Sequence, residues 1–133
     1  MKKLLTAVTV FALTLGANSV AYSKTIKMGI ILGFTGPIES LTPAMAASAE
    51  LAFKEASDSG SLLNGSKIEV VRADSTCVDS AAATAAAEGV ISQGVAAIMG
   101  ADCSGVTGAI ASNVAVPNVV VMISPSATSP GLT

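Results

Sequence analysis

The stretch that decides the fold is VAAIMGADCSG, residues 95–105. Its first five residues form an apolar run typical of a buried strand, and the VTGAIAS segment that follows at residues 106–112 is typical of a short helix. We therefore interpret residues 100–105 as a strand-to-helix turn with Ser104 in the N-cap position. Open α/β proteins bind ligands at such turns, and a helix N-terminus favours anions, so a small molecule with a carboxylate is the expected ligand.

Further apolar segments on both sides of this turn alternate with helical segments. Strands are predicted at residues 26–33, 67–73, 95–99 and 118–123, with the second strand near a sheet edge. Helices are predicted at residues 44–57, 80–93 and 105–113, the first capped by Thr42 and the second by Asp79. This alternation, with its short connections, predicts an α/β fold with a doubly wound parallel sheet and right-handed crossovers.

Polar loops follow the carboxyl ends of the predicted strands. Because parallel strands all end at one edge of the sheet, the following loops should face a common space: residues 34–42, 74–79, 100–104 and 124–128. Three of these loops are rich in hydroxyl groups and bare backbone, which suits a polar ligand held by hydrogen bonds. Asp74 and Asp102 fall in the loops, but solvated loop aspartates are common, and neither is assigned a role.

Composition limits the class of protein. The 133 residues give room for one domain, or for part of a larger protein, and 51% of them are hydrophobic while only 3% are aromatic. Such a composition favours an alanine- and valine-rich sheet covered by alanine-rich helices. The net charge of -2 and the absence of a long basic run argue against nucleic acid as a partner.

Residues 1–23 have the organisation of a secretory signal peptide. A pair of lysines precedes an apolar run at residues 4–15, and small residues lead to a cleavage point after Ser23 or Ala21. An apolar run of this length is too short to span a bilayer, which needs about 20 residues. We therefore expect residues 24–133 to be exported in soluble form.

Cys77 and Cys103 are the two cysteines of the chain. An even count in an exported chain favours a disulfide, and both residues follow predicted strands at the same edge of the sheet. Two alternatives stay open: two unrelated buried thiols, or a nucleophile elbow in which Cys103 attacks a substrate. The chain contains no histidine to act as the base for that attack, so an exported α/β hydrolase using Cys103 is the weaker interpretation.

The central turn also has the spacing of a phosphate-binding loop, G-x-x-x-x-G, from Gly100 to Gly105. Val106 stands where that loop needs a lysine, so nucleotide binding is not expected. No cofactor and no metal site is predicted for the chain.

Four segments together resemble a known family. Gly36-Pro37 and residues 74–79, 100–104 and 123–128 occur in the order and spacing of the periplasmic branched-chain amino acid binding proteins. The resemblance implies the first lobe of the type 1 periplasmic binding fold, with residues 24–133 as its incomplete N-terminal part. It also implies a non-enzymatic, monomeric periplasmic subunit that captures branched-chain or related amino acids for the membrane permease of an ABC importer. A ligand-sensing receptor domain of the same fold is the alternative.

The resemblance further implies roles for individual residues. Ser104 falls on the serine whose hydroxyl and amide hold the ligand carboxylate, while Ser126 and Thr128 fall on residues that meet the ligand's ammonium and carboxylate groups. The family's disulfide falls on the two cysteines of this chain. Leu41 stands where the family often has an aromatic residue that covers the ligand, so the resemblance leaves open which amino acid side chain is bound.

Overall fold

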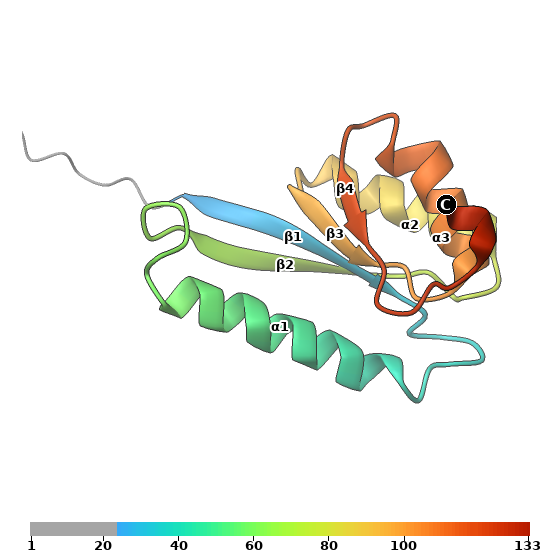
Figure 1. The fold of residues 1–133 in the computed structure, drawn as a ribbon, viewed down its shortest axis with the longest axis horizontal. Helices are drawn as coiled ribbons and strands as arrows, with labels where there is room; N and C mark the ends of the chain where they lie inside the picture. The colour runs from blue at the N-terminus through green and yellow to red at the C-terminus, as the bar shows by residue number, and fades with distance from the viewer. Residues whose placement is uncertain (1–23) are drawn as a thin grey trace, which may run out of the picture.

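A computed structural model of the protein describes residues 24–133, and the predicted signal peptide at residues 1–23 lies outside the described residues. Strands and helices alternate along this part of the chain, as predicted (Figure 1). The strands are β1 (Thr25–Leu32), β2 (Lys67–Asp74), β3 (Ala97–Gly100) and β4 (Val121–Ile123). The helices are α1 (Thr42–Asp58), α2 (Ser80–Ser92) and α3 (Ser104–Ile110), with a π-helical turn at Ala111–Ala115 and a 3-10 turn at Pro130–Leu132. Within residues 24–133, none of the helices combines the length and the apolar character needed to cross a membrane.

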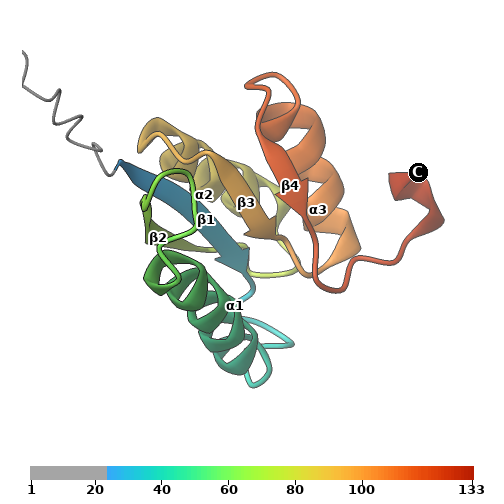
Figure 2. The same cartoon turned by 60° about the vertical axis from the view of Figure 1, so that its left-hand side comes forward.

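The described strands form one parallel sheet in the order β2-β1-β3-β4. This confirms the predicted doubly wound sheet, because the chain moves from β1 to one edge and then back past β1 toward the other edge. Right-handed crossovers place the helices of the two directions on opposite faces. Accordingly, α1 covers one face, and α2 and α3 cover the other (Figure 1; Figure 2). β2 is an edge strand, as its alternating pattern predicts.

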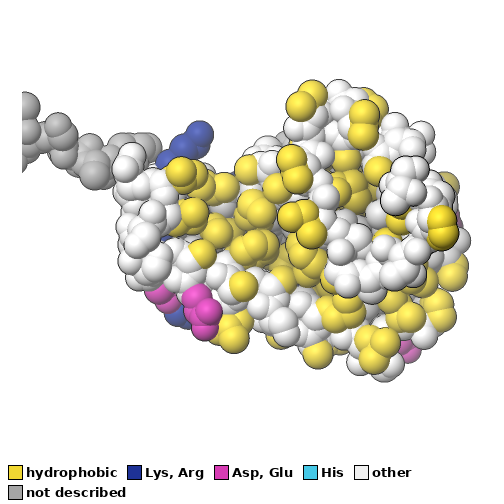
Figure 3. Space-filling view, in the orientation of Figure 1, with side chains coloured by type: hydrophobic (Ala, Val, Ile, Leu, Met, Phe, Trp, Pro, Cys, Tyr) yellow, Lys and Arg dark blue, Asp and Glu magenta, His cyan; other side chains and the backbone are white. Residues whose placement is uncertain are grey.

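On its own face of the sheet, α1 covers only the half formed by β1 and β2. Met99 of β3 belongs to the apolar cluster under α1, and the strand register places Ile123 of β4 beside it on the same face. Ile123 is nonetheless 70% exposed. Figure 3 shows this side of the molecule as a hollow with many apolar side chains.

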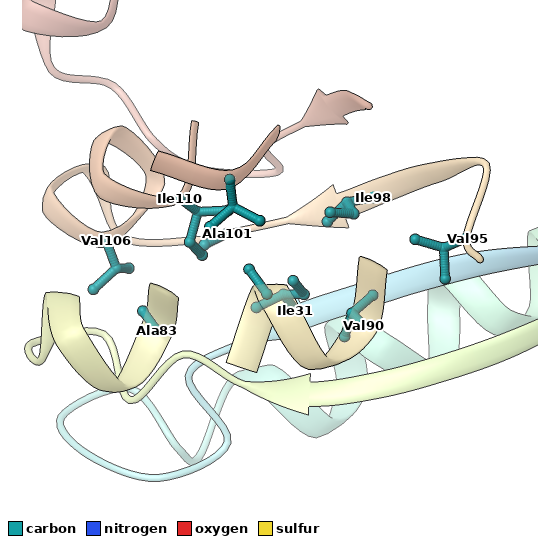
Figure 4. Packing of buried hydrophobic residues seen from close by; sticks show 10 residues of the cluster. Ile31, Ala83, Val90, Val95, Ile98, Ala101, Val106 and Ile110 are labelled. Atoms are coloured by element: carbon teal, nitrogen blue, oxygen red, sulfur yellow. The ribbon is translucent and has the colours of Figure 1, made fainter. Parts of the chain in front are cut away.

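The two faces of β1 pack against separate apolar clusters. Ile31 points toward α2 and α3, where Ala83, Val90 and Val106 lie around it (Figure 4). Ile30 and the other residues of the opposite parity point toward α1. Because alternate side chains of the strand are buried on both faces, the strand reads as a nearly continuous apolar run.

The predicted start of the fourth strand is wrong. β4 begins at Val121 rather than at residue 118. The preceding residues form a turn, because the Asn118 amide donates to the Val114 carbonyl at 3.2 Å and Val119 has a φ of 57°. The prediction begins the strand at Asn118 because the valines that follow favour a strand, although Pro117 and Asn118 are residues typical of a turn.

Of the N-caps predicted for the first two helices, the structure confirms only the second. α1 begins at Thr42 rather than at residue 44, and Leu41 holds its N-cap position, so the predicted cap is wrong. The Thr42 hydroxyl is buried and donates to the Gly33 carbonyl at 3.1 Å, which ties the helix to the end of β1. Asp79 caps α2 as predicted, since its Oδ1 accepts two amides of the first turn at 2.9 and 3.0 Å.

Candidate functional site

The loops that follow the four strands meet at the carboxyl edge of the sheet, as the sequence predicts. Hydrogen bonds join the loop after β1 to the loops after β2 and β3, and join the loop after β4 to the loop after β3. These bonds connect residues that are 24 to 69 positions apart in the chain. We call this edge the rim, and define it as residues 33–42, 74–79, 100–104 and 124–129.

Asp102 lies at the centre of the rim. It is 2% exposed, and its carboxylate accepts the Gly33 amide at 2.8 Å, the Cys103 amide at 2.9 Å and, at 3.5 Å, the Ser75 hydroxyl. Because Gly33 follows β1 and Ser75 follows β2, this carboxylate connects the ends of three neighbouring strands. Such donors offset the cost of burying a charge. The sequence interpretation, which treated Asp102 as a solvated loop residue, is therefore wrong.

Two serines attach the loop after β4 to the same place. The Ser126 hydroxyl donates to the Asp102 carbonyl at 2.8 Å, and the Ser124 hydroxyl donates to the Ala101 carbonyl. Ser124 Oγ also accepts the amides of Ser126 and Ala127 at 3.3 and 2.9 Å. These bonds fix the position of Ser126 relative to the strand-to-helix turn.

Ser104 connects the end of that loop to the start of α3. Its Oγ accepts the Thr128 amide at 3.1 Å and the Ser129 amide at 3.2 Å. The predicted N-cap role of Ser104 is wrong, because Cys103 holds the N-cap position and Ser104 is the first residue of α3. Its hydroxyl oxygen accepts amides of the loop after β4 instead of amides of its own helix. Within the described residues no acceptor takes the Ser104 O–H, so this hydroxyl is free to donate.

The structure thus brings three of the four predicted ligand-binding residues together. Ser104, Ser126 and Thr128 belong to one hydrogen-bonded group, and Thr128 is exposed. Leu41 lies in the loop after β1, where it is 60% exposed. No hydrogen bond among the described residues joins Leu41 to the other three, although all four belong to the rim.

Asp74 fastens the loop that leads to Leu41. Its carboxylate accepts the Thr35 hydroxyl at 2.6 Å, the Thr35 amide at 3.3 Å and the Thr76 amide at 2.8 Å. Partial burial raises the pKa of Asp74, but these bonds and one from the Phe34 amide outweigh burial, so the pKa lies below its usual value of 3.8. The sequence interpretation assigned Asp74 no role, and this contact shows that it holds two rim loops together.

A charged pair outside the rim supports the same loop. The Arg72 guanidinium lies 5.6 Å from the centroid of the Phe34 ring, and Arg72 Nε donates to Glu50 Oε1 of α1 at 2.6 Å. This hydrogen bond lowers the pKa of Glu50 and raises the pKa of Arg72. Because both side chains are well exposed, the pair contributes little to stability, and we assign it the positioning of Phe34.

A disulfide joins Cys77 to Cys103, with the two Cα atoms 5.2 Å apart. This confirms the predicted disulfide. The bond links the loop after β2 to the residue that immediately precedes α3. No free cysteine occurs in residues 24–133. The attack of Cys103 on a substrate requires a thiolate, so the hydrolase interpretation and the interpretation as two separate thiols are both wrong for this structure.

The fold and the rim together define a class of protein. A parallel α/β sheet carries, at its carboxyl edge, fixed hydroxyl groups and backbone groups from several loops, which is how open α/β lobes bind small polar ligands. The match to a family model for the periplasmic binding proteins covers residues 25–133. The chain therefore belongs to the periplasmic binding protein family.

Relatives of known sequence and structure agree with this assignment. The chain is 30% identical over 121 residues to the Leu/Ile/Val-binding protein of Citrobacter freundii and 29% identical over 121 residues to that of Escherichia coli; each alignment covers 91% of this chain and 32% of the relative. A branched-chain amino acid transporter substrate binding protein from Streptococcus pneumoniae, solved with isoleucine, matches 82% of this chain and 31% of that protein with 35% identity and a TM-score of 0.73. An ABC transporter substrate-binding protein from Desulfitobacterium hafniense, solved with leucine, matches with 29% identity and a TM-score of 0.68.

The length of these relatives differs from that of the chain. The chain spans about a third of the curated relatives that it matches. The resemblance to branched-chain amino acid binding proteins of the type 1 periplasmic binding fold is confirmed.

Proposed function

We propose that the chain is part of the amino-acid-binding subunit of an ABC importer and acts in the periplasm after removal of residues 1–23. In this proposal residues 24–133 form the N-terminal part of the first lobe. They bind a branched-chain or related amino acid as a monomer, without a cofactor and without catalysis, for delivery to a membrane permease. The relatives support this proposal, because they are binding proteins and two of the solved ones hold isoleucine or leucine.

The observation that carries the proposal is the opposite hydrogen-bonding state of two serines of the rim, Ser104 and Ser126. Ser104 Oγ already accepts two amides, so its O–H remains available to donate to a carboxylate. Ser126 already donates its O–H to the Asp102 carbonyl, so its lone pairs remain available to accept from an ammonium group. A free donor and a free acceptor in one hydrogen-bonded group suit the carboxylate and ammonium of an α-amino acid.

Thr128 and Leu41 complete the proposed site. The Thr128 hydroxyl is exposed on the same loop as Ser126, where it can bind the ligand's carboxylate or ammonium group. Leu41 offers an exposed apolar side chain from the loop after β1, which suits an aliphatic ligand side chain.

A nuclear magnetic resonance titration tests this proposal. Leucine is added to the ¹⁵N-labelled mature chain, and the amides of Ser104, Thr128 and Ser129 are expected to shift. Isovalerate lacks the ammonium group and isopentylamine lacks the carboxylate, so both should give much smaller shifts at equal concentration. A folded chain in which none of these amides responds to leucine would contradict the proposal.

A pair of variants shows whether the Ser104 hydroxyl is responsible. Ser104→Ala should abolish the leucine-dependent shifts at Thr128. Ser48→Ala is the matched control, because Ser48 is an exposed hydroxyl on α1 that donates only to the Ala44 carbonyl of its own helix. Equal responses of the two variants would place the ligand carboxylate elsewhere.

A further inference from the structure

A pocket opens at the amino edge of the sheet, which is the edge opposite the rim (Figure 1). We call it the amino-edge pocket. It is lined by residues 24–27 at the start of β1 and by residues 63, 64, 66, 94 and 96 of the loops that lead into β2 and β3. Its volume is about 450 Å³, and small-molecule sites commonly measure roughly 300–1,000 Å³. The amino-edge pocket is therefore large enough for a ligand of its own.

The two basic side chains without an acidic partner in residues 24–133 lie at this pocket. These residues include five basic and nine acidic ones. Three of the basic side chains have a carboxylate within 4.0 Å: Lys54, Lys67 and Arg72. Within residues 24–133, Lys24 and Lys27 form no ion pair, and both line the amino-edge pocket, whose lining contains no acidic residue. Positive charge therefore gathers at this pocket although residues 24–133 as a whole are acidic.

Lys27 is half-buried, which makes the lack of a counter-charge costly. The strand register places Glu69 of β2 beside it, but Glu69 does not line the pocket, and no ion pair joins the two among the described residues. Thr25 and Asn64 line the same pocket, and neither side chain makes a hydrogen bond within residues 24–133. An anion in the pocket would supply the counter-charge and accept hydrogen bonds from these donors.

Apolar side chains form much of the remaining wall. Ile26, Leu63 and Ala96 line the pocket, and Leu63 is 68% exposed. Ammonium groups bind the charged part of a ligand, whereas apolar walls favour a ligand that carries hydrocarbon next to its charge. The pocket therefore suits a small organic anion with an aliphatic body better than it suits a bare inorganic anion.

We propose that the amino-edge pocket is a second binding site, which takes a small aliphatic carboxylate with its charge beside Lys24 and Lys27 and its hydrocarbon against Ile26 and Leu63. This site is separate from the rim, because the two lie at opposite edges of the sheet. The proposal rests on the pocket and its charges and does not depend on which ligand the rim binds.

Nuclear magnetic resonance on the ¹⁵N-labelled mature chain tests this proposal, with hexanoate as the probe. Hexanoate should shift the amides of Lys27, Asn64 and Gly94. 1-Hexanol lacks the charge and inorganic phosphate lacks the hydrocarbon, so both should give much smaller shifts at equal concentration. Raising NaCl from about 0.02 M to about 0.5 M should weaken hexanoate binding to the native chain, because salt screens partly exposed charges.

Three lysine variants show whether the pocket charges are responsible. Lys24→Gln and Lys27→Gln should each raise the dissociation constant of hexanoate by at least about threefold, because each removes one charge that faces the anion. Lys54→Gln is the matched control. It removes the same charge from an exposed lysine of α1 that is paired with Asp58 and lies outside the pocket, so the dissociation constant should stay unchanged.

Several results would overturn the proposal. A folded chain whose pocket amides do not respond to hexanoate would do so, as would shifts at Ser104 and Thr128 in their place, which would assign hexanoate to the rim. Equal responses to hexanoate and 1-hexanol would show that charge has no part in binding, and equal responses to hexanoate and phosphate would show that the apolar wall has none. Equal losses in Lys27→Gln and Lys54→Gln would show only a general effect of net charge.

A membrane surface is the other source of an organic anion, and sedimentation with vesicles distinguishes it. The mature chain should stay in solution with vesicles of phosphatidylglycerol as it does with vesicles of phosphatidylcholine. Binding to the phosphatidylglycerol vesicles that is lost in Lys27→Gln would assign the pocket to lipid headgroups and overturn the proposal for a free carboxylate. The leucine titration at the rim is a separate readout, so a failure here leaves the proposed function standing.

Discussion

Asp102 uses both oxygens of its side chain as acceptors. Oδ2 accepts the Gly33 amide, and Oδ1 accepts the Cys103 amide and the Ser75 hydroxyl. Asp102→Asn preserves the shape but places an N–H donor against one of these donors. Because the site is buried, we expect this variant to lower the free energy of unfolding by about 1–3 kcal/mol, measured by urea denaturation at neutral pH.

Asp79→Asn is the matched control for this substitution. One oxygen of Asp79 accepts both capping amides of α2, and asparagine is an equally good N-cap residue. We expect its free energy of unfolding to change by only a few tenths of a kcal/mol. Equal losses for the two variants would show that the position of Asp102 has no special requirement for two acceptors.

Asp74 makes the stability of the rim depend on pH. Its pKa in the folded protein lies below the usual value of 3.8, so its hydrogen bonds stabilise the fold above that pH, and the contribution is lost as the pH falls through the folded-state pKa. The difference in unfolding free energy between the native chain and Asp74→Asn should be constant from about pH 6 to 7 and shrink below about pH 4. Urea denaturation across this range checks it, and a difference that does not vary with pH would contradict it.

At the scale of elements, sequence patterns predict the strands and helices whose formation depends on interactions within a short segment. The apolar runs of β1 and β3 and the Asp79 cap of α2 predict strands and a helix within a few residues, because burial on both faces and N-capping are properties of short segments. Contacts between distant segments are different. In the sequence, Asp102 resembles any polar loop residue. Its contact with the Gly33 amide arises only when the fold places the end of β1 beside it, and no spacing within residues 100–105 indicates that contact.

Gly100 also makes a contact with a distant segment that the sequence does not indicate. A Cβ atom at this position would lie 1.9 Å from the Ile31 carbonyl oxygen of the neighbouring strand. The sequence suggests only a turn, whereas the structure requires glycine because two strand ends approach closely. The family resemblance predicts Ser104 and Ser126 as ligand-binding residues, but their opposite hydrogen-bonding states depend on partners that only the folded chain supplies.

The disulfide is the strongest connection between two elements of the rim. It joins residues that are 26 positions apart, and closing a loop of that size stabilises a protein by about 3.5 kcal/mol in the chain-entropy model. We expect the double variant Cys77→Ser, Cys103→Ser to unfold at a correspondingly lower urea concentration. Adding reductant to the native chain should produce the same shift and should leave the double variant unchanged. An unshifted midpoint in both experiments would show that the other rim contacts suffice.

At the scale of the whole molecule, the proposed ligand site has a wall on one side only within residues 24–133. The proposed ligand groups, Ser104, Ser126 and Thr128, all lie on the rim of a single sheet, and Ser126, Thr128 and Leu41 are exposed. Ligand clefts commonly bury roughly 70–90% of a ligand's surface, and in two-lobed proteins closure of the lobes supplies that enclosure. The rim can therefore orient an amino acid without enclosing it.

The openness of the proposed site predicts the affinity of residues 24–133 for an amino acid. Residues 24–133 should bind leucine with a dissociation constant of about 1 mM or weaker, corresponding to about -4 kcal/mol, because hydrogen bonds made in contact with water contribute little to binding. Calorimetry on the mature chain, with the Escherichia coli Leu/Ile/Val-binding protein measured in parallel as the control, gives the value directly. Micromolar binding by the chain alone would mean that the rim encloses the ligand without a second wall, and the assignment of residues 24–133 as part of one lobe of a two-lobed site would then be wrong.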